Sequence, residues 1–419
     1  MRFPICIYIL LFALALGPAY AKPTIWVYTD LSDPRDQRAG GHPQNDPDDI
    51  CSLAALLLEA NRFDIEGIVF SSTNRKGLKD ATPFIESTFA EAYAMARKPL
   101  NKALGGFQES IPFYRSSLYQ GGDPVKFDPE VDYSNLGSFP TVDKLIQLAT
   151  KKQVYVLNWG PTTESAIAVK HCLDTGNLDA LENITVLSHW TKSWIAQGTP
   201  EQPFKVANCR DDGRACSYMH ETAKAHPSVK FIELGSVGQT GVVNGSSKYP
   251  NFHDFQSSAL GQIFVHSKFY HGKPDQSDGS TFWLLTEAFG PTLKTYSHDG
   301  TLDQETEENA RDLFLKNGHA IQDDLLKRSR IAAEGGVFPT EFIASRFTYV
   351  YQFLDGRYSI YVPYQANYTF VSPSGETVME DTVDPGNHHL DLSSLDPATY
   401  KVLVTTGGLT RDFTLTVER

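Results

Sequence analysis

The sequence predicts an α/β fold, in which an open, mostly parallel β-sheet has helices on both faces and a small antiparallel β-sandwich follows at the C-terminus. Two observations support this prediction. Short apolar strands alternate with amphipathic helices along most of the chain, and from about residue 346 the hydrophobic period changes to two. The length of 419 residues accommodates one large domain and one small one.

The first elements follow a strand–helix–strand order. Residues 25–29 form a short apolar strand, residues 48–61 a helix with apolar residues on one face, and residues 65–71 the next strand. Short connections between such elements require parallel pairing with a right-handed crossover. The same order recurs with helices at 142–151 and 164–173 and strands at 154–157, 184–187 and 229–234. Because ligands of such sheets bind beyond the carboxyl ends of the strands, the polar residues that follow each strand are the candidate site residues.

The C-terminal segment has the pattern of an antiparallel sandwich. Turn pairs such as Ser374-Gly375, Pro385-Gly386 and Gly407-Gly408 separate its strands. The expected strands lie at 358–362, 368–371, 388–392, 400–405 and 412–417.

The N-terminus predicts export. Residues 1–21 resemble a signal peptide, with Arg2 before an apolar run and Ala19-Tyr20-Ala21 as the cleavage site. We therefore expect a secreted or periplasmic protein whose mature chain begins at Lys22. No later stretch approaches the roughly 18 apolar residues of a membrane helix, so no membrane anchor is expected.

The charge and the cysteines narrow the function class. The chain has 37 Lys and Arg against 50 Asp and Glu, a net charge of −13 that becomes −14 when the signal peptide takes Arg2 with it. This balance disfavours a nucleic-acid partner and suits a bound divalent cation. The mature chain keeps Cys51, Cys172, Cys209 and Cys216. Cys209 and Cys216 are the two closest in sequence. They either form a disulfide or remain free thiols, and the sequence does not decide between these alternatives.

Acidic residues cluster around the first strand and helix. Asp30 follows the strand, while Asp48 and Asp49 begin the helix, so the crossover brings their carboxylates to one edge of the sheet. Such carboxylates repel each other unless a hard cation such as Ca²⁺ neutralises them. An alternative is that Asp48 and Asp49 only cap the helix and oppose its dipole.

The acidic pattern resembles the signature of the nucleoside hydrolases, and in particular a divergent exported branch with an Asn-x-Pro-Asp-Asp motif. Thr29-Asp30 precedes a long loop and then Asn45-Asp46-Pro47-Asp48-Asp49. Four later segments are similar to the family in the same order. They are Gly67 to Asn74, Leu157-Asn158-Trp159-Gly160-Pro161-Thr162-Thr163, Asn208 to Asp212, and Ser277-Asp278 with the residues up to Leu285.

The resemblance implies a role for each of these residues. It assigns calcium ligation to Asp30, Asp49, Asp278 and the main-chain carbonyl of Trp159. The indole of Trp159 belongs either to the core or to the substrate site. The resemblance also implies two catalytic residues. Asp30 is the base that takes a proton from water, and Asp48 either holds the sugar hydroxyls or shares the role of the base. Asn74 and Asn208 would bind the remaining sugar hydroxyls.

The sequence departs from the family pattern in two places. Ser277 stands where the family commonly has a histidine before the late aspartate, so the group that protonates the leaving base is not fixed by the pattern. The candidates are His189, which is followed by Trp190, and His253, His266 and His271. The spacing after Asp30 is also unusually long. The inserted residues 31–44 contain Asp33, Asp36 and His42, so either a loop carboxylate supplants Asp30 or the loop is a lid.

Together these features predict an exported, calcium-dependent hydrolase of N-glycosidic bonds that acts on a nucleoside or a related glycoside. The alternative is a carbohydrate-binding protein that keeps the scaffold without the activity and contacts polysaccharide through its C-terminal module. The predicted division is a signal peptide at 1–21, a nucleoside hydrolase-like catalytic domain at 22–345 and an immunoglobulin-like sandwich at 346–419.

Overall fold

The computed structural model describes most of the chain. The described residues are 22–36, 48–119, 123–199, 201–267, 269–270, 273–352 and 356–418. The predicted signal peptide, His42, Asn45 and His271 lie outside them, as do residues 37–47 of the long loop after Asp30.

The centre of the molecule is a six-stranded sheet whose neighbouring strands all pair in parallel. Its order is β3-β2-β1-β4-β5-β6. The strands are β1 (Thr24–Tyr28), β2 (Asp64–Phe70), β3 (Phe113–Arg115), β4 (Val154–Asn158), β5 (Ile184–Ser188) and β6 (Lys230–Glu233). The predicted open parallel sheet is therefore confirmed, and only the three-residue edge strand β3 was not predicted.

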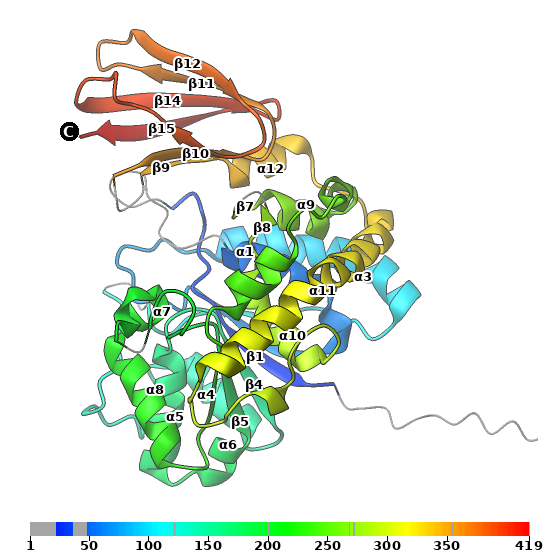
Figure 1. Ribbon diagram of the computed structural model, residues 1–419, viewed down its shortest axis with the longest axis vertical. Helices are drawn as coiled ribbons and strands as arrows, with labels where there is room; N and C mark the ends of the chain where they lie inside the picture. The colour runs from blue at the N-terminus through cyan, green and yellow to red at the C-terminus, as the bar shows by residue number, and fades with distance from the viewer. Residues whose placement is uncertain are drawn as a thin grey trace, which may run out of the picture.

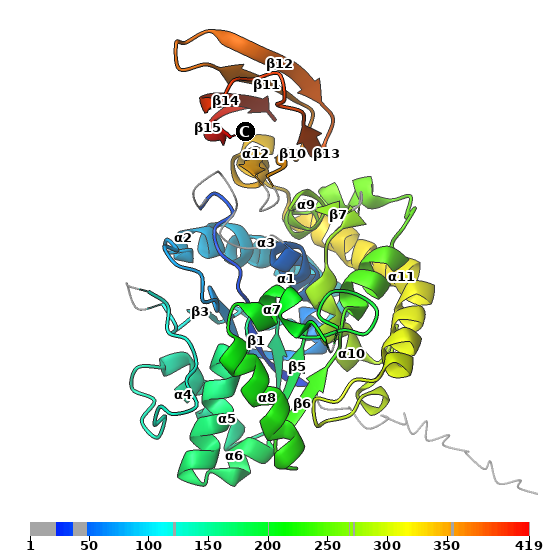
Figure 2. The ribbon, with the colours of Figure 1, turned by 60° about the vertical axis from the view of Figure 1, so that its left-hand side comes forward.

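Helices cover both faces of this sheet, as predicted (Figures 1 and 2). Alternate residues of β1 belong to different cores: Ile25 and Val27 pack in one, and Trp26 and Tyr28 in the other. The first core includes residues of α1 (Asp48–Leu58), α3 (Glu91–Leu104), α9 (Ala259–His266), α10 (Ser280–Thr286) and α11 (Gln304–Ala332). The second includes residues of α4 (Pro140–Ala149), α5 (Thr163–Thr175), α6 (Leu178–Glu182) and α8 (Gly213–Ala225).

Shorter elements complete the α/β part. These are the helices α2 (Thr82–Ile85), α7 (Ala207–Arg210) and α12 (Thr340–Phe347), the small strands β7 (Phe269–Tyr270) and β8 (Lys273–Pro274), and the π-helical segments Glu86–Ala90 and Gly238–Val243. The 3-10 turns are Ala60–Arg62, Pro203–Lys205, Phe252–Ser257, Ser277–Gly279, Leu293–Thr295 and Ala333–Gly335.

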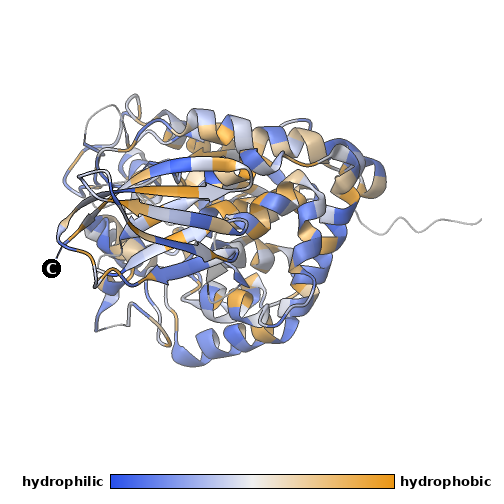
Figure 3. Cartoon of the chain, turned by 90° about the horizontal axis from the view of Figure 1, so that it is seen from above, coloured by the Kyte–Doolittle hydropathy of each residue, from blue (hydrophilic) through white to orange (hydrophobic). Residues whose placement is uncertain are grey.

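The C-terminal segment forms two antiparallel sheets that share one core, which confirms the predicted sandwich. The first sheet has the order β13-β10-β9, with β9 (Tyr349–Gln352), β10 (Tyr358–Val362) and β13 (Gly386–Leu390). The second has the order β12-β11-β14-β15, with β11 (Ala366–Val371), β12 (Thr377–Val383), β14 (Ala398–Thr406) and β15 (Leu409–Val417). Seen from above, its strands carry hydrophobic residues next to hydrophilic ones (Figure 3). The strands β9 and β12 were not predicted.

The central strand β10 of the three-stranded sheet is buried on both faces. Ile360 and Val362 of β10 lie in the sandwich core, whereas Tyr361 between them lies in the same core as the helix α1. Tyr349 of β9 also belongs to that core. The sandwich therefore packs directly on the α/β part, next to α12 (Figure 1). The predicted boundary between residues 345 and 346 falls inside α12 and stays a prediction.

No helix in the described ranges combines the length and the apolar character that a membrane span requires.

Candidate functional site

The candidate site lies where the strand order reverses, between β1 and β4. Asp30 follows β1, and Trp159 and Gly160 follow β4. A Cβ atom at Gly160 would lie 2.9 Å from the Cβ of Asp30 and 3.1 Å from the carbonyl oxygen of Ser72. Glycine at this position therefore allows the two chain segments to approach each other.

Three carboxylates from two distant segments converge at this edge. Asp48 and Asp49 lie in the first turn of α1, and Asp278 lies in the 3-10 turn before α10. One ligand atom from each of these three residues lies within 4.8 Å of the others. A hollow of about 260 Å³ is lined by these residues and by three more that the sequence predicted, Asp30, Trp159 and Asn208.

Hydroxyl groups fix the three carboxylates in place. Thr29, at the end of β1, donates to Asp49. The hydroxyl of Ser277 donates to Oδ2 of Asp48 at 3.2 Å, and that of Ser52 to Oδ2 of Asp278 at 3.3 Å. Ser277, which stands where the family commonly has histidine, thus contacts a member of the acidic cluster.

The electrostatics of the cluster favour a bound cation. Asp49 is buried, and this burial raises the pKa of its carboxyl well above the usual range. The negative charges of Asp30, Asp278 and Asp48 raise it further. All three ligand atoms are carboxylate oxygens, the donors that Ca²⁺ and Mg²⁺ prefer. The donor set therefore fits the predicted calcium ion.

One positive charge already lies in the hollow. Nη2 of Arg75 lies 3.3 Å from Oδ2 of Asp30, and its Nε lies 3.5 Å from Oδ2 of Asp211. Arg75 lines the hollow, although the sequence pattern did not single it out. Asp30, which lies beside the three clustered carboxylates, is thus paired with this guanidinium.

Asn208 links the two loops on either side of the hollow. Its Nδ2 donates to the carbonyl of Trp159 at 3.1 Å and to that of His189 at 2.7 Å. No donor among the described residues is hydrogen-bonded to its Oδ1, so this oxygen is the acceptor that Asn208 can offer to a ligand. The neighbouring Cys209 forms a disulfide with Cys216, which decides the alternative that the sequence left open.

The indole of Trp159 belongs to the core. It is almost fully buried, and its N–H donates to the hydroxyl of Thr281 at 2.8 Å. The indole therefore fixes the position of the main-chain carbonyl, which is the group that the sequence analysis assigned to the metal.

Asn74 has a different environment from the other predicted site residues. It is not among the described residues that line the hollow. Its Nδ2 donates to the carbonyl of Val125 at 2.8 Å, and its Oδ1 accepts from the hydroxyl of Thr163 at 3.0 Å. Both ends of the amide are thus engaged, and its role in sugar binding stays a prediction.

Of the histidines considered for proton transfer, His189 lines the hollow. Its Nε2 lies 3.9 Å from Oδ1 of Asp278, and burial lowers the pKa of its imidazole to about 3. His253 and His266 are not among the described residues of the lining. His266 instead packs against Tyr364 of the C-terminal part, with ring centroids 4.8 Å apart and the ring planes tilted by 51°.

The loop carboxylates lie apart from the hollow. Asp33 is paired with Arg35, and Asp36 accepts from the backbone N–H of Lys79 at 2.7 Å. Neither is among the described residues that line the hollow.

Further residues of the lining were missed by the sequence analysis. Asp275 is fully buried and lies three residues before Asp278. The Asp-x-x-Asp spacing was a usable signal, because residues three apart on a tight turn face the same side. Gln197 and Gln239 also line the hollow, but their sequence surroundings contain no comparable signal. Trp190, which the sequence analysis named together with His189, lines the hollow as well.

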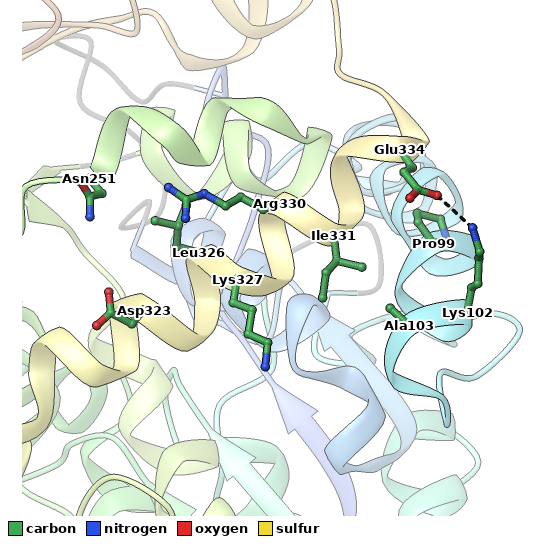
Figure 4. Close-up of a pocket in the computed structure, with 10 residues that line it drawn as sticks. All are labelled: Pro99, Lys102, Ala103, Asn251, Asp323, Leu326, Lys327, Arg330, Ile331 and Glu334. Carbon is green, nitrogen blue, oxygen red and sulfur yellow. Dashed lines mark ion pairs between the residues drawn. The ribbon is translucent and has the colours of Figure 1, made fainter.

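A larger hollow of about 760 Å³ lies elsewhere, between α3 and the exposed side of α11 (Figure 4). It contains the ion pair of Lys102 with Glu334, at 3.6 Å, together with Arg330 and Lys327. Arg330 is paired with Asp254. None of the carboxylates that the sequence predicted for the metal site is among the residues that line this hollow.

The fold and the site define an α/β protein with an acidic, cation-compatible hollow at the switch point of a parallel sheet. Residues 41–208 match the family described as cellulose-binding Sde182, nucleoside hydrolase-like domain. The predicted resemblance is therefore confirmed, and this part of the chain is nucleoside hydrolase-like. The match includes Asp48, Asp49, Trp159 and Asn208, whereas Asp30, Asp278 and the C-terminal sandwich lie outside it. No curated protein matches the chain.

Proposed function

We propose that this protein is an exported, calcium-dependent hydrolase of N-glycosidic bonds. The observation on which the proposal rests is the convergence of Asp48, Asp49 and Asp278 within 4.8 Å, beside Asp30, in one hollow. Carboxylates that repel each other strongly are costly to bury, so their retention together is best explained by a cation.

In this proposal Asp30, Asp49, Asp278 and the carbonyl of Trp159 hold the calcium ion. When bound, the ion would act as a Lewis acid that makes water more acidic and attracts vicinal sugar hydroxyls. Because a carbonyl oxygen has two lone pairs, that of Trp159 can accept from Asn208 and still ligate.

The chain's own residues would position and activate the reactants. Asp30 takes a proton from the attacking water. Asp48 and Oδ1 of Asn208 accept hydrogen bonds from the sugar hydroxyls. These anionic and polar oxygens also stabilise the positive charge that develops on the sugar ring as the bond breaks.

No residue of the described ranges is assigned to protonate the leaving base, and the candidate His271 lies outside those ranges. The side chain of Ser277 is a poor acid, and His189 with a pKa of about 3 is neutral at pH 7. A substrate whose leaving group is stable as an anion suits such a site best.

The lack of an assigned acid in the part of the chain that the structure describes favours a second candidate, a protein that binds carbohydrate without cleaving it. The description of the matching family as cellulose-binding supports the same candidate. In this alternative the hollow would bind hydroxyl pairs of a glycan through the same cation.

The test combines calcium titration calorimetry with an assay of a nucleoside panel, on wild type and Asp49→Ala. Asp312→Ala is the matched control, because Asp312 is an exposed aspartate on α11. We expect calcium binding and turnover in the wild type and in the control, with both lost in Asp49→Ala. Calcium binding without turnover of any nucleoside would support the second candidate, and a wild type that binds no calcium would refute both.

Export is part of the proposal. The signal-peptide pattern of residues 1–21 and the Cys209–Cys216 disulfide support it, because disulfides persist in oxidising compartments. Cleavage after Ala21 is tested by N-terminal sequencing of the secreted protein, where a mature chain that begins at Lys22 is expected.

A further inference from the structure

The negative charges of the acidic hollow outnumber the positive ones among the lining residues that the structure describes. The carboxylates of this lining belong to Asp30, Asp48, Asp49, Asp275 and Asp278. Arg75 is the lone Arg or Lys among the described lining residues. The imidazole of His189 adds no charge at pH 7, because burial lowers its pKa to about 3. Arg75 therefore supplies the positive charge that this part of the chain offers to the carboxylates.

The backbone fixes Arg75 beside Asp30. The segments that follow β1 and β2 stay side by side beyond the ends of the strands, because the N–H of Ser72 donates to the carbonyl of Thr29 at 2.9 Å. The amide of Asn74, the residue before Arg75, is held at both ends by hydrogen bonds. The guanidinium is thus presented to the hollow from an anchored loop, and Asn74 helps to position it.

The guanidinium of Arg75 bridges two carboxylates from different segments. Its Nη2 lies 3.3 Å from Oδ2 of Asp30, and its Nε lies 3.5 Å from Oδ2 of Asp211, at the end of α7. The planar fork of arginine allows one side chain to serve two such partners. Both distances exceed the roughly 2.7–2.9 Å of a tight charge-assisted hydrogen bond. Arg75 is therefore shared between Asp30 and Asp211, and neither carboxylate holds it tightly.

Asp30 stands apart from the carboxylates that converge. The group whose ligand atoms lie within 4.8 Å of one another consists of Asp48, Asp49 and Asp278, without Asp30. The charge of Asp30 nevertheless raises the pKa of Asp49, so the two carboxyl groups are close. A cation held by Asp49 would attract Asp30 and repel the guanidinium of Arg75, because the two positive charges share one carboxylate.

We propose that Arg75 competes with calcium for Asp30 and thereby sets the calcium affinity of the hollow. In the calcium-free protein, Arg75 neutralises Asp30. When Asp30 ligates the ion, Asp211 remains as a partner for Arg75, so the guanidinium does not lose both of its carboxylates. Asp211 is thus a positioning residue that favours calcium binding without contacting the ion. The inference rests on the proposed function, because it requires the proposed calcium site.

A double-mutant cycle tests the competition by calcium titration calorimetry on the full chain. The proteins are the wild type, Arg75→Gln, Asp211→Asn and the double variant. Arg214→Gln is the matched control, because it also removes one arginine charge. The side chain of Arg214 is 66% exposed, is paired with Asp128 at 2.8 Å and is not among the described residues that line the hollow.

Arg75→Gln should bind calcium about tenfold more tightly than the wild type, because Asp30 no longer has a competing partner. Asp211→Asn should bind about fivefold more weakly, because Arg75 then keeps Asp30 as its main partner. In the double variant, the affinity should equal that of Arg75→Gln, and Arg214→Gln should bind as the wild type does. Damage to the fold would weaken calcium binding, so a gain in affinity separates the competition from a structural role of Arg75.

Two results would overturn the competition. One is an Arg75→Gln variant that binds calcium no more tightly than the wild type. The other is an Asp211→Asn effect of equal size with and without Arg75, which would reflect only the general attraction of a carboxylate for the ion. If Arg75→Gln does not fold, an Asp211→Asn variant with wild-type affinity is the result that overturns it.

Failure of the proposed function gives a different result. In that case the wild type and Arg75→Gln would both bind no calcium, and the competition would fall with the calcium site. A wild type that binds calcium, together with an Arg75→Gln variant of unchanged affinity, would remove the competition alone.

Discussion

At the residue scale, the environment of Asp49 explains most of the site. Its carboxyl is buried, accepts a hydrogen bond from Thr29, and is surrounded by three further carboxylates. Burial and repulsion both disfavour its ionised form, and a cation would reverse both effects. In the proposed calcium site, Asp49 would therefore link calcium binding to the stability of the folded protein.

Asp49→Asn should separate these two effects. The neutral amide removes repulsion, so we expect the calcium-free variant to be more stable than the calcium-free wild type by about 1–3 kcal/mol. Its calcium affinity should fall by about 100-fold or more, because a charged ligand is lost. Thermal unfolding in chelator and in excess calcium measures both quantities, with Asp312→Asn as the control. An unchanged calcium-dependent shift in the melting temperature would contradict the metal assignment of Asp49.

At the element scale, the segments after β5 and β6 are held by buried groups rather than by regular structure. The disulfide joins α7 to α8 across seven positions of sequence, next to Asn208. On the other side, Glu233 at the end of β6 accepts hydrogen bonds from Thr191 and Gly235. The position of the segments that line the hollow thus depends on the disulfide and on the hydrogen bonds of Glu233.

Replacement of both Cys209 and Cys216 by serine should lower the free energy of unfolding by roughly 2–3 kcal/mol. This follows from the short loop that the disulfide closes, on the chain-entropy model. Denaturant titration with and without reductant measures the loss. Reductant should destabilise the wild type by a similar amount and leave the double variant unchanged; equal sensitivity of the two proteins would refute the pairing.

Glu233 should make stability depend on pH. Burial raises the pKa of its carboxyl to about 7 from the ordinary 4.5. Between these values the folded protein binds the proton more tightly than the unfolded chain, so stability falls as the pH rises. The loss from this group is roughly 3 kcal/mol. The nearby imidazole of His220, whose pKa burial lowers to about 3, acts in the opposite direction, so the wild type shows only the net effect.

Comparison with Glu233→Gln isolates this contribution. We expect the stability of the variant relative to the wild type to rise between pH 4.5 and pH 7, as measured by urea unfolding at each pH. Glu182→Gln, an exposed glutamate in α6, should follow the wild type. Parallel curves for the wild type and Glu233→Gln would contradict the raised pKa.

At the scale of the whole molecule, the C-terminal sandwich and the α/β part share a buried contact. Tyr361 of β10 and Tyr349 of β9 stack with ring centroids 5.5 Å apart and belong to the same core as α1. The helix α1 carries Asp48 and Asp49 at its start. The sandwich thus shares a core with the helix that presents Asp48 and Asp49.

Tyr361→Ala should lower the overall stability by about 3–5 kcal/mol, as expected for a buried aromatic side chain. The two parts should then unfold in separate transitions, because the contact that couples them is weakened. Differential scanning calorimetry detects this, with Val378→Ala on the exposed side of β12 as the control. A single transition at an unchanged temperature would show that the parts are not coupled through β10.

The sequence predicted the parallel sheet and most of its strands, because each strand is a short apolar run between amphipathic helices. It did not predict β3, β9 or β12. β3 has only three residues, and the seven residues of β12 are exposed or half-buried, so neither has a recognisable hydrophobic pattern. Both are edge strands, which are less buried than central strands and therefore need fewer hydrophobic residues.

The site was predicted in part for a similar reason. Asp30 follows a strand, and Asp48 and Asp49 begin the helix of the same crossover. These local positions place the three residues at one edge of the sheet without knowledge of the rest of the fold. Arg75 and Asp275 were missed, because their place in the hollow depends on how loops pack. The sugar-binding role of Asn74 was implied only by the resemblance to the family, and the surrounding structure uses both ends of its amide.

The sequence by itself determined the fold class, the two-part organisation and the acidic character of the candidate site, because periodicity and strand ends are local properties. The resemblance implied that Asp278, more than 200 residues away from Asp49, belongs to the same site, and the structure brings their carboxylate oxygens within 4.8 Å of each other. Only the tertiary structure decided that Arg75 lines the hollow and that Tyr361 of the sandwich joins the core that includes α1. These outcomes depend on the packing of distant segments, whose burial and mutual repulsion are set by the whole fold and not by any neighbouring residue.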